Sequence, residues 1–312
     1  MRVSNTPLVS VIMNCYEGEK YLSVALRSVL SQTYSNWEII FWDNCSNDMS
    51  WEIARSFGPK IRLFRSAVTT SLGEARRLAV SHARGEWLAF LDVDDIWHPE
   101  KLVVQMEALS DSDHILGYAG IEEVDHDLKK IRTMVPKWDS GYSLEQQLYY
   151  FEINLVTSMV KKSVLDEEKI NFDGGMQASE EYNLFMRLLP HGSVHVEKKI
   201  LAKYRVYAES LTYKKLGRWA LERRETLRHL LERHPHLSGS EAYQAAHRQA
   251  DYYEACALMS RGEHAKAREL LATYKSSSLF FFLYVLAYFP SIWRFVHHPN
   301  TKKKLTSALK II

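Results

Sequence analysis

The sequence predicts an α/β fold with a mostly parallel sheet and a helical C-terminal extension. Three observations support this prediction. Short apolar runs alternate with helical patterns through the first hundred residues, polar clusters follow several of the apolar runs, and the chain becomes helical in pattern after Ser210.

The alternating half begins with an apolar, β-branched run at residues 8–13. We interpret such runs as buried strands, and stretches with apolar residues on one face as helices. In chain order the predicted elements are strand 8–13, helix 18–32, strand 37–42, helix 51–57, strand 61–64, helix 73–83 and strand 87–91. Strands joined by helices imply right-handed crossovers, which place parallel strands side by side in one sheet.

The C-terminal third is predicted to be helical. One helix runs over residues 215–233 and stops before Pro235, and a third ends near Tyr274. Between them, residues 238–241 (SGSE) have the spacing of a capping box and open a second helix. We place the domain boundary near residue 213.

The composition limits the classes of protein. The chain has 312 residues, of which 46% are hydrophobic and 25% charged, enough for one large domain and an appendage. A net charge of +2 gives no indication of nucleic-acid binding. Cys15, Cys45 and Cys256 have no metal-ligand spacing and form no disulfide framework, which favours a reducing cytosol. The first apolar run is too short for a signal-peptide core, so we expect a cytoplasmic protein.

Polar clusters follow three of the predicted strands. Residues 14–16 (NCY) follow the first strand, Asp43 and Asn44 the second, and residues 92–95 (DVDD) the fourth. In open α/β sheets, ligands bind beyond the carboxyl ends of the strands. The sequence therefore predicts a ligand site at this edge of the sheet.

The third cluster contains three carboxylates, Asp92, Asp94 and Asp95. Crowded carboxylates repel one another, and they can share Mg²⁺ or Mn²⁺ with a diphosphate. The alternative is an acidic segment before the helix predicted to start at Pro99. The crowding favours the metal.

The other clusters can bind a nucleoside. The Asp43 carboxylate can accept the imide N–H of a uracil ring, or it can close an Asx turn over Asn44–Ser46. Asn14 and Tyr16 can supply a polar contact and an aromatic lid for the base, or they can simply end the strand in a loop.

These segments, in order, resemble the family 2 glycosyltransferases of the Rossmann-like GT-A fold. The resemblance covers residues 7–213 and is carried by residues 9–16 (VSVIMNCY), 28–34 (SVLSQTY), 42–48 (WDNCSND), 73–76 (GEAR), 85–95 (GEWLAFLDVDD), 180–188 (EEYNLFMRL) and 204–212 (YRVYAESLT). It implies a catalytic domain over residues 1–213, with a nucleotide-sugar half up to about residue 110 and an acceptor half over 111–213.

The resemblance also implies roles for single residues. The nucleotide-sugar ligands would be Asn14, Tyr16, Asp43, Arg76 and Asp92, and the metal ligands Asp94, Asp92 and Asp95, with Asp94 the direct one. Glu181 falls where the family places an aspartate as general base. That base would deprotonate an acceptor hydroxyl, which displaces the nucleoside diphosphate with inversion.

The sequence departs from the family pattern at two positions. Glu181 replaces the aspartate and is one methylene longer, so either it or Glu180 can present the base, or both can be acids at a helix start. Tyr207 replaces a histidine that can bind metal, and a neutral phenol is a poor ligand. Arg205 remains to contact a phosphate or a carboxylate.

Two aromatic features lie outside these motifs. Trp97 and His98 can form a stacking wall for an acceptor sugar, or they can be ordinary packing residues. In the tail, residues 279–289 are apolar but too few to span a bilayer. Beyond Glu269 there is no acidic residue, whereas the basic residues are Lys275, Arg294, Lys302, Lys303, Lys304 and Lys310. This pattern favours peripheral contact with an anionic inner leaflet over a buried helix or a dimer contact.

The hypothesis is a metal-dependent, inverting glycosyltransferase on the cytoplasmic side of a membrane. Its donor would be a nucleoside-diphosphate sugar and its acceptor a glycan or lipid-linked glycan of the cell surface. The alternative is a catalytically degenerate transferase that binds nucleotide sugars or acts as a scaffold. A sugar nucleotidyltransferase is disfavoured because residues 14–20 (NCYEGEK) contain a single glycine, where that class needs a glycine-rich phosphate loop.

Overall fold

The computed structural model describes residues 6–206 and 216–297. Contacts divide the chain into two units. The first comprises Met1–Gln147 with Phe151–Val206, and the second Leu148–Tyr150 with Tyr207–Ile312. The domain boundary predicted near residue 213 lies outside the described residues.

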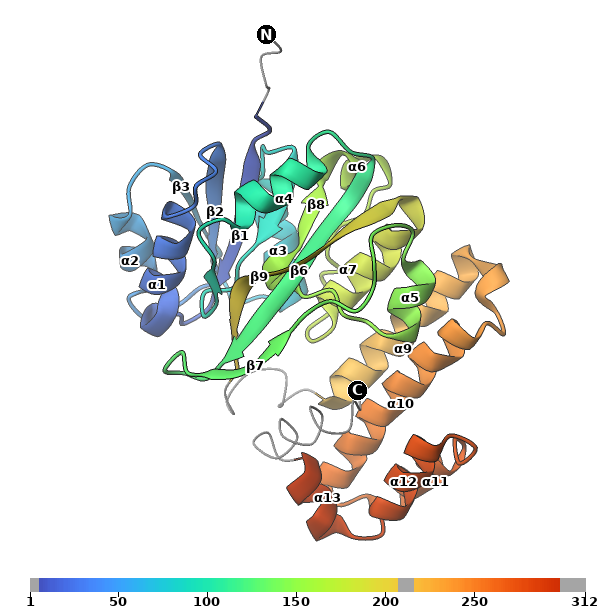
Figure 1. Cartoon of the computed structure of the whole chain (residues 1–312). Helices are drawn as coiled ribbons and strands as arrows, with labels where there is room; N and C mark the ends of the chain where they lie inside the picture. Colours follow the sequence, from blue (N-terminus) through green and yellow to red (C-terminus); the bar gives the residue numbers. More distant parts are fainter. Residues whose placement is uncertain (1–5, 207–215, 298–312) are drawn as a thin grey trace. The chain divides into compact units, whose positions relative to one another are not determined.

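The first unit is built on one mixed sheet (Figure 1). Its order is β3-β2-β1-β4-β8-β6-β9-β5, and β7 pairs with β6. The strands of the described residues are β1 (Val9–Cys15), β2 (Trp37–Asp43), β3 (Ile61–Arg65), β4 (Trp87–Phe90), β5 (Ile96–Trp97), β6 (His114–Val124), β7 (Lys130–Met134), β8 (Met159–Lys161) and β9 (Ser193–Arg205).

Helices connect and cover these strands. In the first unit they are α1 (Glu19–Leu30), α2 (Ser50–Ser56), α3 (Leu72–Ser81), α4 (Lys101–Leu109), α6 (Lys162–Glu167) and α7 (Glu180–Leu188), and α5 (Leu144–Tyr149) runs into the second unit. The sequence-predicted strands and helices up to residue 91 are all present, with ends that differ by a few residues. β3, β2, β1 and β4 are parallel neighbours, which confirms the predicted α/β fold class.

Burial explains the parallel half of the sheet. β1 is nearly all buried because it lies between β2 and β4, with helices on both sides. On α1, Leu22, Leu26 and Val29 recur at helical spacing and are fully buried in the core cluster beside Val11 and Met13 of β1. This is the 3.6-residue periodicity that made the helix predictable.

The sheet's other half is mixed in direction. β8 runs antiparallel to β4, while β6 and β9 are parallel to each other. The two-residue strand β5 pairs with β9, so that Ile96 lies opposite Lys203 and Trp97 opposite Ala202. This pairing joins the segment after the acidic cluster to the end of β9.

The structure corrects the acceptor-wall interpretation of Trp97. Its side chain is 2% exposed in the core, and its indole N–H donates to the Val156 carbonyl at 2.7 Å. A side chain enclosed in this way cannot stack against a sugar. His98, the next residue, is exposed.

The described part of the second unit, after residue 215, is helical. They are α9 (Leu216–Arg233), α10 (Glu241–Ser260), α11 (His264–Ala272), α12 (Ser278–Leu286) and α13 (Pro290–His297). The predicted capping box starts two residues too early: Ser240, not Ser238, caps α10, and its hydroxyl accepts from the Tyr243 N–H at 3.2 Å. Gly262 ends the turn after α10 with a φ of 81°, a conformation that favours glycine.

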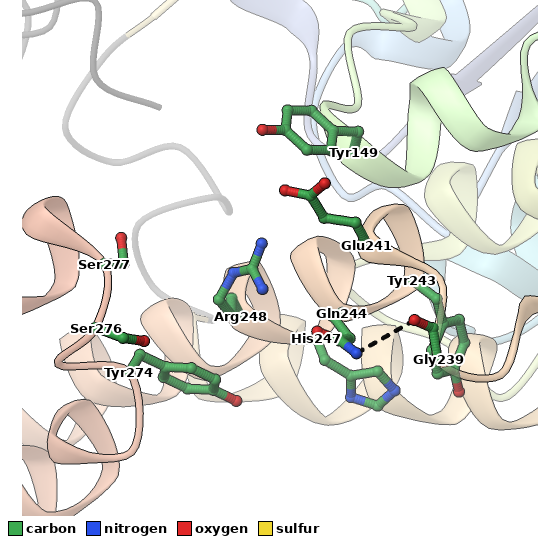
Figure 2. Close-up of a pocket in the computed structure, with 10 residues that line it drawn as sticks. All are labelled: Tyr149, Gly239, Glu241, Tyr243, Gln244, His247, Arg248, Tyr274, Ser276 and Ser277. Carbon is green, nitrogen blue, oxygen red and sulfur yellow. Dashed lines mark hydrogen bonds between the residues drawn. The ribbon is translucent and has the colours of Figure 1, made fainter.

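A cavity of about 770 Å³ lies among residues of this second unit. Figure 2 shows polar and aromatic side chains around it, including Glu241, His247, Arg248 and Tyr274. None of the residues predicted for the functional site lines it. Among residues 6–206 and 216–297, no helix is both long and apolar enough to cross a bilayer.

One buried charge stands out in the first unit. Lys101 at the start of α4 is fully buried, and its Nζ lies 4.2 Å from the centre of the Trp97 ring. No hydrogen-bond partner for this Nζ is present within the described part of the chain. Burial lowers the pKa of the Lys101 ammonium well below its ordinary value of 10.5.

We predict that Lys101→Met stabilises the protein near neutral pH. The apolar side chain has a similar length and needs no hydrogen bonds, so thermal unfolding should shift upward by about 2–4 °C or more. The lowered pKa means that the unfolded chain holds the Lys101 proton more tightly. The gain should therefore shrink as pH rises from the folded pKa towards 10.5. The exposed Lys203→Met serves as the control, and an unchanged or lower midpoint for Lys101→Met would contradict this reasoning.

Candidate active site

The parallel strands bring three of the predicted polar clusters to one edge. β1 and β2 end side by side, with Cys15 opposite Asp43 in register. The Asn44 N–H donates to the Cys15 carbonyl at 2.8 Å, and the Leu91 N–H donates to the Ile12 carbonyl at 3.1 Å. The residues that follow β1, β2 and β4 therefore lie next to one another at this edge of the sheet.

Asp43 is fully buried at the end of β2. One carboxylate oxygen accepts from the Ser46 N–H at 3.1 Å, and the other lies 2.9 Å from Nε of Arg65. The Asx turn considered in the sequence analysis is therefore present. Arg65 was not recognised in the sequence, although its position at the end of β3 could have indicated it.

Asn14 and Tyr16 differ in exposure. The Asn14 side-chain amide nitrogen is buried and has no hydrogen-bond partner in the described part of the chain. Leaving a buried donor unsatisfied is costly, so a ligand acceptor here would be favourable. The Tyr16 side chain is 54% exposed, which leaves its ring available for stacking.

The carboxylates of the acidic cluster have different surroundings. Arg76 Nη2 binds both oxygens of Asp92, at 2.8 and 3.0 Å, while the Asp92 side chain stays 38% exposed. Asp94 is half-buried. Asp95 is buried and accepts from the Arg205 N–H at 2.8 Å. Burial raises the pKa of Asp95, and the neighbouring Asp94 and Asp92 raise it further.

Asp95 and Arg205 thus hold two chain segments together. Beyond that backbone bond, Arg205 Nε donates to the Asp94 carbonyl at 2.8 Å, and Nη1 donates to the His126 carbonyl at 2.6 Å. The guanidinium also lies 4.3 Å from the centre of the Tyr21 ring. The structure therefore gives Arg205 backbone carbonyls as hydrogen-bond partners, and its contact with a phosphate or carboxylate stays a prediction. Tyr207 lies outside the described residues.

A buried ion-pair network joins α3 to α7. Arg76 is 4% exposed and reaches Glu180, which is 3% exposed, through Nη1, while Nη2 holds Asp92. Burial alone would lower the pKa of Arg76, but the negative charges of Asp92, Glu180 and Glu181 outweigh it and raise the pKa. The guanidinium therefore stays charged and connects the acidic cluster to the start of α7.

A close backbone approach makes this network possible. A Cβ on Gly73 would lie 2.1 Å from the Asp173 carbonyl, so only glycine allows α3 to come so near the segment before α7. Ser71 fixes the same junction, because its hydroxyl accepts from the Glu74 N–H at 3.1 Å and donates to the Gly174 carbonyl at 2.5 Å. Arg76, one turn further along α3, then reaches Glu180.

The two adjacent glutamates at the start of α7 are in different positions. Glu180 is buried against Arg76, whereas Glu181 is half-buried. The charge of Glu181 still acts on Arg76 and on the buried Tyr204 hydroxyl, whose pKa is raised by burial first and by nearby carboxylates second. Glu181 therefore lies close to the network, whereas the ion pair with Arg76 is made by Glu180.

The donor set fits a divalent cation shared with a phosphate ligand. Magnesium commonly binds one or two carboxylates together with substrate phosphates. Asp92 and Asp94 offer two partly accessible carboxylates at the end of β4. Within residues 6–206 and 216–297 no group of three histidine, cysteine or acidic side chains is arranged to hold a metal, so a cage made by the protein alone is not present there.

We predict that Arg76→Met strongly destabilises the first unit, because it removes the buried cation that forms ion pairs with Glu180 and Asp92. Breaking a buried ion pair costs about 3–5 kcal/mol. The neighbouring Arg77→Met should cost less than about 1 kcal/mol, since Arg77 pairs with Glu74 at the surface. Chemical denaturation measures both variants. Adding Glu180→Gln to Arg76→Met should recover part of the loss, and equal effects of the two arginine variants would disprove the assignment.

Comparison with known proteins agrees with the resemblance seen in the sequence. Residues 10–164 match the model of glycosyl transferase family 2. An uncharacterized glycosyltransferase of Rickettsia typhi is 30% identical over 214 residues, 66% of this chain and 66% of the relative. The Escherichia coli UDP-Glc:alpha-D-GlcNAc-diphosphoundecaprenol beta-1,3-glucosyltransferase WfgD is 26% identical over 211 residues, 67% of this chain and 81% of the relative. The match spans 30% to 66% of the length of five rickettsial relatives.

Solved structures share the fold. Staphylococcus aureus TarS 1–349 in complex with UDP-GlcNAc has a TM-score of 0.59 at 17% identity, covering 97% of this chain and 92% of that one. The mannosyltransferase PcManGT of Pyrobaculum calidifontis, in complex with GDP-Man and Mn²⁺, has a TM-score of 0.59 at 14% identity, covering 98% and 88%. With the sheet, the ordered motifs and the family match in agreement, the chain belongs to glycosyl transferase family 2 and has the GT-A fold.

Proposed function

We propose that this chain transfers a sugar from a nucleoside-diphosphate donor to a hydroxyl of a glycan or lipid-linked glycan, in the synthesis of a cell-surface polysaccharide. One observation carries the proposal: Arg76 joins the acidic cluster after β4 to the start of α7, where Glu181 lies. Arg76 thereby holds the proposed metal ligand Asp92 close to the segment that carries the proposed base, Glu181. Two of the similar proteins support these substrate classes. The name of WfgD includes a lipid diphosphate acceptor, and TarS was solved in complex with UDP-GlcNAc.

The nucleoside would bind across the ends of β1 and β2. The unsatisfied Asn14 amide can donate to a base or ribose oxygen, and the exposed Tyr16 ring can cover the base. Asp43 already accepts from the Ser46 N–H and forms an ion pair with Arg65, so we propose that it fixes the shape of this loop as well as making any contact to the base.

The diphosphate would lie at the end of β4 with a divalent cation held by Asp94 and Asp92. When bound, the cation neutralises charge on the departing nucleoside diphosphate. Arg76 keeps Asp92 in a fixed orientation through two hydrogen bonds. We assign Asp95 a supporting role, because its buried carboxylate positions this segment against Arg205.

Glu181 would act as the general base. It would take the proton of the acceptor hydroxyl as that oxygen attacks the anomeric carbon, and the carbon–oxygen bond to the diphosphate breaks on the opposite side, with inversion. Glu180 is the poorer candidate, because its carboxylate is buried and already engaged by the Arg76 guanidinium. We therefore assign the role of base to Glu181 and the ion pair with Arg76 to Glu180.

The proposed function makes a prediction about donor binding. UDP, GDP, dTDP and CMP should be compared by thermal shift, each with Mn²⁺ and with EDTA. One nucleotide should raise the unfolding midpoint only with the metal, and Asp94→Asn should abolish that shift because it removes a metal ligand. Asp111→Asn, an exposed aspartate after α4, should leave it unchanged. Absence of any nucleotide effect would favour a degenerate, scaffolding protein.

The second prediction separates the glutamates. Glu181→Gln should lower kcat about 100-fold or more while donor binding and stability persist, because only proton removal is lost. The acid limb of the pH profile of kcat should disappear with it. Glu180→Gln should instead lower stability and donor binding, since it disturbs Arg76 and Asp92. The opposite pattern would assign the base to Glu180.

A further inference from the structure

Helices α12 and α13 of the second unit expose an unusual number of large apolar side chains. We call this surface the α12–α13 face. Its members, each at least 40% exposed, are Phe281, Phe282, Val285, Tyr288, Phe289, Ile292 and Phe295. So many large exposed apolar side chains within fifteen consecutive residues, 281–295, indicate an interaction site.

The other side of the same helices already packs into a core. Phe280, Leu283 and Leu286 of α12, with Trp293 of α13, join a buried cluster with side chains of α10 and α11. Figure 1 shows α11, α12 and α13 following the long helix α10. A surface helix usually has one apolar face and one polar face, whereas α12 is apolar on both. Packing within residues 216–297 thus does not explain the exposed side.

Among the described residues after Glu269, the charged side chains are basic. Beyond Glu269 the sequence has no acidic residue. Arg268 lies 4.6 Å from the centre of the Tyr288 ring, and Lys275 lies 3.9 Å from that of Tyr284. Arg294 on α13 is exposed beside Phe295. Aromatic rings accompanied by basic groups suit the boundary between headgroups and acyl chains.

We propose that the α12–α13 face docks on an anionic lipid bilayer. Phe281, Phe282, Phe289 and Phe295 would enter the acyl boundary, while Arg268, Lys275 and Arg294 would contact headgroup phosphates. A second copy of the chain fits less well, because a symmetric contact would bring the basic side chains Arg268, Lys275 and Arg294 of the two copies together. Docking deepens the proposed function by placing the enzyme where a lipid-linked acceptor lies, but it can be tested without turnover.

The test is co-sedimentation of the full-length protein with vesicles. Phosphatidylcholine vesicles that contain phosphatidylglycerol should bind the protein, pure phosphatidylcholine vesicles should bind it less, and salt should weaken binding. The double variant Phe282→Gln and Phe295→Gln should bind at least about tenfold more weakly, because two inserted rings are lost. Leu221→Gln, an equally exposed apolar residue on α9, is the matched control and should bind as the native protein does.

Further measurements separate the outcomes. Circular dichroism and thermal unfolding should show that the double variant is folded, and its stabilisation by donor nucleotide should match that of the native protein. Vesicle binding that the double variant loses and the control keeps supports the proposal. No binding to anionic vesicles overturns it, and so does a lipid-free dimer in size-exclusion chromatography that the double variant abolishes. Loss of the nucleotide effect in the native protein would instead count against the proposed transfer reaction.

Discussion

The site depends on one buried guanidinium. Arg76 holds Asp92 on one side and Glu180 on the other, and both the arginine and Glu180 are almost fully enclosed. Removing such charges from water is expensive, and hydrophobic residues of similar volume could stabilise the fold as well. A hydrophobic residue, however, could not hold the carboxylates of Asp92 and Glu180 in fixed orientations. The network thus favours a defined site geometry over maximal stability.

The same network leaves the site negatively charged. Arg76 carries one positive charge, while Asp92, Glu180, Asp94 and Glu181 carry four carboxylates when ionised. A diphosphate would add further negative charge to this region and would be repelled without a cation. This imbalance is a physical argument for the proposed metal dependence, and it does not rely on the family resemblance. It also predicts that metal and nucleotide bind cooperatively, because each reduces the electrostatic cost of the other.

The strands, helices and polar clusters could be predicted from the sequence, but the role of each acidic residue within the clusters could not. Periodic apolar residues identified every strand and helix up to residue 91, and strand ends located the polar clusters. Which of two adjacent like residues becomes buried was not predictable. Asp95 is turned inward by an amide 110 residues away, and Glu180 by an arginine 104 residues away. The Ser240 cap was missed because Ser238 and Ser240 are both suitable capping residues. For Trp97 the sequence left packing and sugar stacking as alternatives, and only its burial in the structure decides for packing.

The proposed docking of the α12–α13 face would give the helical extension a role beyond stability. An acceptor confined to a membrane is met far more often by an enzyme held at the same surface than by one diffusing in the bulk. Binding must still be weak enough for the enzyme to move between acceptors, and a few interfacial aromatics with basic neighbours give reversible attachment of that kind. A membrane-spanning helix would hold the enzyme permanently. Helix α12 has nine residues and is apolar on both sides, so it is too short to span a bilayer and suits the reversible attachment proposed here.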